Sequence, residues 1–165
     1  MIFLSLRAAT LITIVCLSTQ GSAQAAPATK TGSLDRVTPV ARAAAAVVDA
    51  FHAALARGDT KAALTLLADD ALVFESGGVE RGKSEYAAHH LAADAAFSQA
   101  VPATRSRRTG DAINSMAWIA SEGRTTGSYK DKPVDRITSE TMVLRRVGST
   151  WRIVHIHWSS AAPRK

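Results

Sequence analysis

Cysteine is almost absent from this sequence, because its 165 residues contain only Cys16. Cys16 lies in the apolar part of a leading segment that we expect to be removed, so the mature chain should hold no thiol. Disulfide bonds, thiolate metal ligands and a cysteine nucleophile are therefore excluded from the mature protein. A hydrophobic core must hold the fold instead, and about 140 mature residues are enough for one such domain.

A basic stripe with interleaved aromatic residues is also missing. The formal net charge is +6, but aromatic residues make up only 5% of the chain and no repeat is visible. The basic residues are scattered, apart from a cluster at Arg105, Arg107 and Arg108 and the pair Arg145-Arg146. Without a recognisable nucleic-acid-binding module, this charge indicates a solvated basic face, and we expect no nucleic-acid partner.

The first 25 residues have the order of a secretory signal. Positive charge at the amino terminus and at Arg7 precedes an apolar run over residues 8–17, and small residues end the segment at Ala25. The apolar run is too short to cross a bilayer, which needs about 20 such residues. We therefore expect a signal peptide over residues 1–25, cleavage near Ala25, a periplasmic or secreted protein, and no membrane span after cleavage.

The rest of the chain predicts a single domain of the α+β class. Residues 26–37 lack apolar periodicity and form a flexible spacer, residues 38–160 form the domain, and residues 161–165 form a tail. Helical patterns come first and strand patterns follow, which predicts an antiparallel sheet with helices packed on one face. The expected helices run from Thr38-Pro39 to Gly58, from the capping residue Asp59 to Leu67 and over residues 83–97, and the expected strands cover residues 71–75, 116–121, 137–146 and 151–159.

The third predicted helix carries an aromatic stripe flanked by polar side chains. At 100° per residue, Tyr86 and Phe97 lie within about 20° of each other, and His89, His90 and Asp94 surround them. A histidine beside a carboxylate can exchange protons or orient a ligand, so His90 and Asp94 are the leading catalytic candidates. The alternative is a helix with solvated histidines, since the small residues on its opposite side leave open which side faces inward.

Strand alternation in residues 151–159 places His155 and His157 on one face with Ile153, and Ile156 and Trp158 on the other. Both faces are largely apolar, which predicts a central strand covered on both sides. Two histidines at i and i+2 can share a metal ion or a ligand oxyanion, although the sequence fixes no third ligand.

Three stretches, at residues 40–67, 72–86 and 151–159, resemble the nuclear transport factor two-like superfamily in its SnoaL-like and ketosteroid isomerase-like branch. The last is also similar to the end of the association domain of calcium/calmodulin-dependent kinase. The resemblance covers about residues 38–160 and implies a cone, in which a curved antiparallel sheet wraps around three helices and leaves a conical pocket. It implies a small apolar or aromatic ligand, with the pocket lined by Tyr86, His89, His90, Phe97, Trp118, His155 and His157.

Ketosteroid isomerases place a tyrosine and two aspartates in this pocket. Tyr86 and Asp94 have suitable types here but cannot be aligned to those roles, and the histidines are additional. Fold alone does not give function, so three hypotheses stay open. They are a small-molecule pocket with acid–base chemistry and no cofactor, a metal-binding module using His89 or His90 with His155 and His157, and a homodimer built on the outer sheet face near Val143 and Trp158.

Overall fold

A computed structural model describes residues 35–164 of the chain. The predicted signal peptide and nearly all of the predicted spacer lie outside the described residues. In chain order, the elements are β1 (Arg36–Val37), the short 3-10 helix η1 (Pro39–Ala41), α1 (Arg42–Ala56), α2 (Thr60–Leu66), β2 (Leu67–Glu75), β3 (Gly78–Arg81), α3 (Lys83–His89), α4 (Leu91–Ala100), β4 (Ala103–Ile113), β5 (Met116–Tyr129), β6 (Lys132–Val147) and β7 (Thr150–Ala161).

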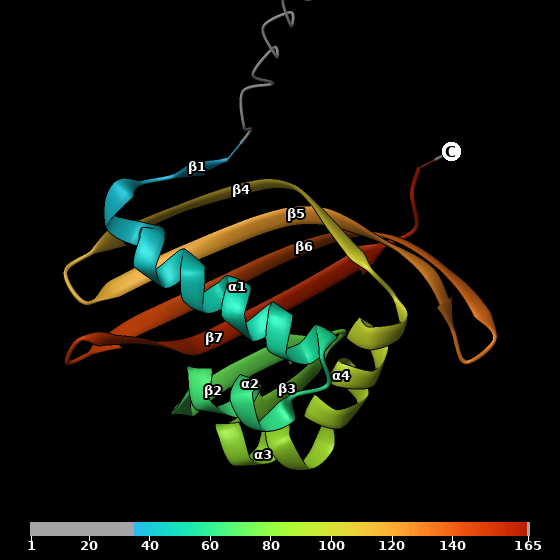
Figure 1. Ribbon diagram of the computed structural model, residues 1–165, viewed down its shortest axis with the longest axis horizontal. Helices are drawn as coiled ribbons and strands as arrows, with labels where there is room; N and C mark the ends of the chain where they lie inside the picture. The colour runs from blue at the N-terminus through green and yellow to red at the C-terminus, as the bar shows by residue number, and fades with distance from the viewer. Residues whose placement is uncertain (1–34, 165) are drawn as a thin grey trace, which may run out of the picture. The chain divides into compact units, whose positions relative to one another are not determined.

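The strands form one curved seven-stranded sheet in the order β1-β4-β5-β6-β7-β2-β3 (Figure 1). The consecutive strands from β4 to β7 pair antiparallel, and β2 pairs antiparallel with β3. The pairs β1–β4 and β2–β7 are parallel. The predicted α+β class with a curved sheet is thus confirmed, although the sheet is not antiparallel throughout. We call the sheet face that α1 covers the inner face, and its opposite the outer face.

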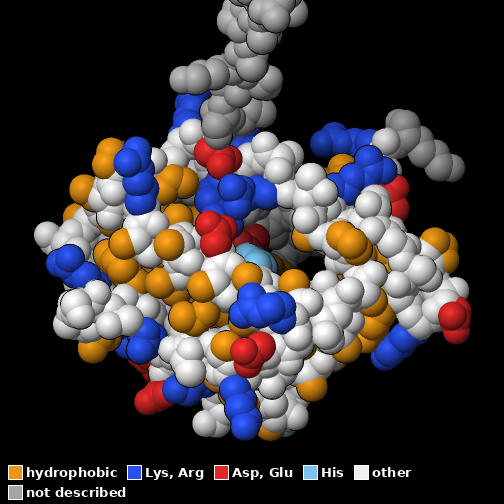
Figure 2. All heavy atoms as spheres, in the orientation of Figure 1, with side chains coloured by type: hydrophobic (Ala, Val, Ile, Leu, Met, Phe, Trp, Pro, Cys, Tyr) orange, Lys and Arg blue, Asp and Glu red, His pale blue; other side chains and the backbone are white. Residues whose placement is uncertain are grey.

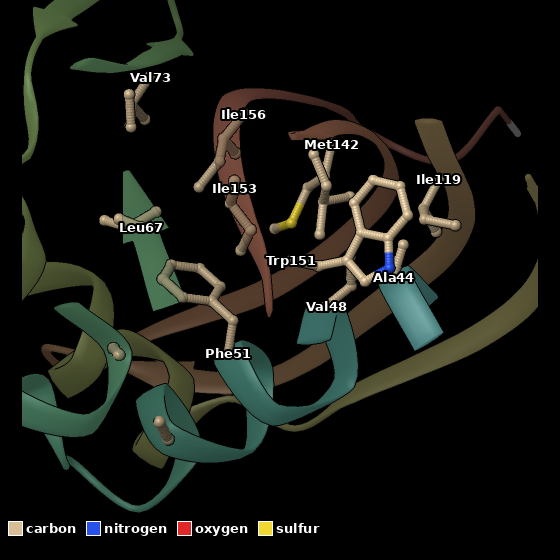
Figure 3. Close-up of a cluster of buried hydrophobic side chains, with 14 of the residues drawn as sticks. Ala44, Val48, Phe51, Leu67, Val73, Ile119, Met142, Trp151, Ile153 and Ile156 are labelled. Atoms are coloured by element: carbon tan, nitrogen blue, oxygen red, sulfur yellow. The ribbon is translucent and has the colours of Figure 1, made fainter. Parts of the chain in front are cut away.

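The core lies between α1 and the inner face. The apolar stripe predicted from the sequence buries Ala44, Val48, Phe51 and Leu55, because residues at these spacings share one side of a helix. They pack with the inward side chains of four strands, among them Ile119, Met142, Ile153 and Ile156 (Figure 3). By length and composition alone, the 18 residues Pro39–Ala56 could cross a membrane, with a mean hydropathy of 1.3. Their apolar side is here the core side of a helix packed on a sheet.

The third predicted helix is two helices. α3 ends and α4 begins at His90, whose φ of −113° departs from helical geometry. The strand β3, which the sequence analysis missed, precedes them. Ser76 and Gly77 both have positive φ, as a two-residue hairpin turn requires, and the turn folds β3 back onto β2.

An extra residue, Val154, interrupts the alternation of β7. Ile153 lies opposite Leu144 and His155 lies opposite Val143, so Val154 has no opposite residue on β6. Such a bulge moves every later side chain of the strand to the other face. Ile156 therefore joins Ile153 in the core, whereas His155 and His157 contact Phe74 on the outer face. The prediction that these two histidines share a face with Ile153 is wrong for this reason.

The start of the domain differs slightly from the expectation. β1 falls at the end of the predicted spacer and pairs with β4. Thr38 precedes η1, but its hydroxyl donates to Asp111 Oδ1 at 2.7 Å instead of capping the helix. Asp59 does cap α2, because its carboxylate accepts the Ala62 N–H at 2.9 Å. Gly58, with a φ of +71°, ends α1 as predicted.

Candidate functional site

A row of polar and aromatic side chains crosses the inner face of the sheet. Directly opposite residues on five neighbouring strands form it, and such residues point to the same side. Trp158 sets that side as the inner one, because its ring stacks on Phe51 of α1 at 6.3 Å between centroids. We call this set the inner row; from β4 to β2 it consists of Arg108, Ser121, Glu140, Trp158 and Glu75.

Glu140 is the centre of the inner row. Its side chain is only 9% exposed. Its Oε2 accepts the indole N–H of Trp158 at 2.8 Å and lies 2.7 Å from Nε2 of His52 on α1. Its Oε1 is buried and has no hydrogen-bond partner among residues 35–164. Arg108 donates to Ser121 Oγ at 3.1 Å and to Asp49 Oδ1 at 2.5 Å, so its guanidinium is bonded to these two residues and not to Glu140.

Two opposed effects act on the Glu140 carboxylate. Burial raises its pKa, but the hydrogen bond and charge of His52, the Trp158 N–H and the charge of Arg108 outweigh burial. The pKa of Glu140 therefore lies below its ordinary value, and the side chain is an ionised carboxylate at neutral pH. A buried ionised group with an unpartnered oxygen is an uncommon feature of a protein interior.

A second group of carboxyls lies at the Glu75 end of the inner row. The Tyr86 hydroxyl donates to Asp94 Oδ2 at 2.8 Å, which joins α3 to α4 across their break. Partial removal from water raises the pKa of Glu75, and the nearby charge of Asp94 raises it further. Burial likewise raises the pKa of Asp94, against the opposing effects of Tyr86 and His90. The acidic end therefore holds two carboxyls whose ionisation is hindered, Asp94 by burial and Glu75 by burial and the charge of Asp94.

Glu80 on β3 completes this acidic end. Its side chain is 7% exposed, and its two oxygens face Nδ1 of His90 and, at 3.3 Å, Nδ1 of His89. Between these groups lies a cavity of about 10 Å³, enough for about one water molecule. It is lined by Val73, Glu75, Gly78, Glu80, Tyr86, His90 and Asp94.

The middle of the inner row lies near solvent. Figure 2 shows a hollow beside α1, where acidic side chains and a histidine gather next to a basic side chain. His52 is the only histidine in α1, and its side chain is 43% exposed. Because His52 is in contact with Glu140, the Glu140 group borders solvent on the His52 side.

The structure brings together part of the predicted site. Tyr86, His90 and Asp94 line one cavity, and His89 reaches Glu80 beside it. Phe97 does not line this cavity; the centroid of its ring lies 5.3 Å from that of Tyr129 on β5. Three predicted pocket residues, Trp118, His155 and His157, lie on the outer face instead.

The predicted metal ligands do not assemble within one chain, because His90 lies on the inner side and His155 and His157 on the outer face. Among the described residues, a different group, Glu80, Glu85 and His89, has donor atoms within 4.8 Å of one another. One oxygen of Glu85 in that group already accepts the Arg81 N–H at 2.5 Å.

Sequence reasoning missed Glu140, His52 and Arg108 as members of a site. One signal was available: alternation in the strand over residues 137–146 places Glu140 on the same face as Met142 and Leu144, which are apolar. A charged residue on an apolar strand face has to find a partner in the interior.

A larger groove, of about 590 Å³, lies away from the inner row. Charged pairs occupy it, with Lys83 against Asp69 and Arg145 against Asp70 at 2.8 Å. A third cation that lines it, Arg152, donates to the carbonyl oxygen of Trp151 at 3.3 Å. Exposed ion pairs of this kind contribute little, so the groove offers less selective chemistry than the inner row.

Solved structures share this fold. A proposed ketosteroid isomerase from Shewanella frigidimarina is 36% identical, with a TM-score of 0.70 over 74% of this chain and 99% of that one. A proposed dehydratase of the NTF2-like family from Streptomyces avermitilis is 18% identical, with a TM-score of 0.64 over 74% and 96%. An NTF2-like protein with a cystatin-like fold from Novosphingobium aromaticivorans is 14% identical, with a TM-score of 0.61 over 72% and 80%.

No protein of curated function matches the sequence. The SnoaL-like domain family matches residues 44–163, which include every strand of the inner row and the helices that face it. The chain therefore belongs to the SnoaL-like domain family and has the NTF2-like, cystatin-like fold.

Proposed function

We propose that this protein binds a small organic molecule against the inner row and moves a proton on it, with Glu75 and Asp94 as the exchanging groups. One observation carries the proposal: Asp94, bonded to Tyr86, lies close enough to Glu75 for their charges to interact, and both have a raised pKa. A raised carboxyl pKa brings the protonated and ionised forms closer together near neutral pH, as acid–base catalysis needs. The similarity to a proposed ketosteroid isomerase supports the same class of chemistry.

The roles follow from burial. Asp94 is the more buried carboxyl, so it keeps its proton and donates a hydrogen bond to a carbonyl oxygen of the substrate, which would take the place of the one water molecule that the cavity can hold. Glu75 is exposed and ionises first, so it takes the proton from the adjacent carbon. Returning that proton to another carbon of the resulting enol moves a double bond, and neither carboxyl is consumed. Tyr86 stays protonated, since burial and the charge of Asp94 raise its pKa, and it holds Asp94 in place.

The test is the conversion of 3-cyclohexenone to its conjugated isomer, followed by ultraviolet absorbance. We expect Glu75→Gln to lower kcat/KM by about 100-fold or more, the usual contribution of a general base. Glu122 is exposed and follows Ser121 on β5, so its side chain points away from the inner row. Glu122→Gln removes an equivalent charge there and should leave the rate unchanged. Equal rates in the wild type and Glu75→Gln, or no conversion above buffer, would refute the proposed chemistry.

We also propose a homodimer through the outer face. Four large apolar side chains are exposed there on β2 and β5: Leu72, Phe74, Met116 and Trp118. Between the two pairs lie β6 and β7, whose outer-face residues in the row from Trp118 to Leu72 are Val143 and His155. Large apolar side chains exposed at both sides of one sheet face are typical of an interaction site. A second copy of the chain fits it, because a twofold axis lets one face serve both partners. Light scattering should report a dimer, and Trp118→Arg should give a monomer; a monomeric wild type at high concentration contradicts this proposal.

The cellular location is a further proposal, based on the segment that ends at Ala25. Export agrees with a mature chain free of cysteine, whose stability does not depend on the redox state of its compartment. The intact mass of protein from a periplasmic extract should correspond to a chain that begins at Ala26. A mass that includes Met1 would argue against cleavage.

A further inference from the structure

Among the residues that the structure describes, no guanidinium group is bonded to the Glu140 carboxylate. The group holds two carboxylates, Glu140 and Asp49, and two guanidinium groups, that of Arg108 and that of Arg105 at its exposed edge. Both guanidinium groups bond Asp49, and Arg105 also bonds Asp35. Within the described part of the chain, only the imidazole of His52 is then in direct contact with the Glu140 carboxylate as a potential cation. One positive charge beside Oε1 would complete the group.

The wider surroundings are also acidic. Glu75, the carboxyl that ionises first, lies at one end of the inner row, and Glu80 lies beside it. The chain as a whole has 20 basic and 14 acidic residues. An acidic interior in a basic protein is not a by-product of composition, so it favours ligands of positive charge.

The walls beside Glu140 suit an organic cation. The Trp158 ring is partly exposed and stacks on Phe51. Indole rings attract ammonium groups over their faces, and a primary ammonium has three N–H donors for carboxylate oxygens. His52 is the exposed partner of the carboxylate, so it is the group that an incoming cation would displace.

We propose that the ligand of the inner row is an organic amine, whose ammonium group binds the buried Glu140 carboxylate beside Trp158. This inference rests on the proposed small-molecule function and names its ligand class. Glu140 and Trp158 hold the charged end of the ligand, while Glu75 and Asp94 face the part that would react.

Calorimetry with two probes of similar size tests the proposal: benzylamine, which is cationic at pH 7, and benzyl alcohol, which is neutral. We expect the wild type to bind benzylamine at least tenfold more tightly than benzyl alcohol. Glu140→Gln should weaken benzylamine binding at least tenfold and leave benzyl alcohol within about twofold, because a hydrogen bond to a charged group is the strong kind. His52→Ala should bind benzylamine at least as tightly as the wild type.

Glu122→Gln is the matched control, since it removes the same charge from an exposed strand position outside the inner row. If Glu140→Gln does not fold, Glu140→Asp keeps the charge but withdraws it by one methylene, and it should still weaken benzylamine selectively. Equal affinity of the wild type for both probes, with benzyl alcohol bound, would overturn the amine inference alone. If neither probe binds, the amine inference fails and the small-molecule proposal loses its support as well.

Discussion

The two faces of the sheet differ in where their charged and apolar side chains lie, and both depart from the usual pattern of apolar residues inside and charged residues outside. The inner face buries ionisable groups, with Arg108 4% and Glu80 5% exposed, among the residues of the hydrophobic core. The outer face exposes large apolar side chains, with Trp118 43% exposed. A buried charge is costly unless it is paired, and exposed apolar surface promotes association, so each feature needs a role that explains it. The comparison assigns ligand chemistry to the inner face and association to the outer face.

The most severe way to break this comparison is to exchange Ile156 and His157. Because of the bulge at Val154, position 156 lies in the core and position 157 is exposed on the outer face. The exchange would bury an imidazole in the core and expose an isoleucine. We expect no cooperative thermal transition by circular dichroism. His157→Ile alone leaves the core unchanged and should change the free energy of unfolding by about 0.5 kcal/mol or less; an exchanged variant as stable as the wild type would disprove the role of the bulge.

The next largest effect on stability is expected from Glu140, the buried carboxylate at the centre of the inner row. The pKa of Glu140 is lowered by folding from an ordinary value of 4.5, so its charge stabilises the fold above pH 4.5. That contribution disappears as the pH falls through the lower, folded pKa. Glu140→Gln should therefore cost about 1–2 kcal/mol in urea unfolding at pH 7, and the difference from the wild type should shrink below pH 4.5. A difference that does not change with pH would show that the charge is irrelevant.

Removing the charge of Asp94 should change the free energy of unfolding in the opposite direction. Its pKa is raised by folding from an ordinary 3.8, so the ionised form destabilises the fold. Asp94→Asn keeps an oxygen for the Tyr86 hydroxyl and removes the charge. We expect the variant to gain stability of up to about 1 kcal/mol relative to the wild type. The gain should grow from pH 3.8 upward and level off above the raised pKa; a loss at pH 7 in urea titrations would contradict this.

The smallest effect on folding is expected on the outer face. Trp118→Ser removes an exposed ring from the protomer, and exposed positions usually change stability by about 0.5 kcal/mol or less. Unfolding should be measured at a protein concentration where light scattering reports a monomer, because a dimer adds its own stability. A loss above about 2 kcal/mol in the monomer would mean that Trp118 is a core residue after all.

Periodicity and turn residues were sufficient to predict the fold class. The α1 stripe, the end of α1 at Gly58 and the cap at Asp59 depend on neighbours within a few positions, so local patterns contain them. Single-residue irregularities do not follow from local patterns. Neither the unpaired Val154 nor the break at His90 has a marker in the sequence such as glycine or proline.

The candidate site was predictable only in part. Tyr86, His90 and Asp94 lie within nine positions of one another, so helical spacing was enough to group them. The inner row joins Glu75 to Arg108 through five strands, and their alignment depends on register set by distant turns and by the bulge. Glu140 could be marked as unusual on its strand, but the identity of its partners could not be deduced.

The acidic interior of this basic chain has a consequence for the kinetics of binding. A cation approaching from solution first meets the repulsion of the chain's net positive charge, which salt screens over about 8 Å at physiological ionic strength. The contact with Glu140 lies inside the protein, where mobile ions screen little. Added salt should therefore speed the entry of an amine and barely change its residence time, whereas association between opposite charges is normally slowed by salt.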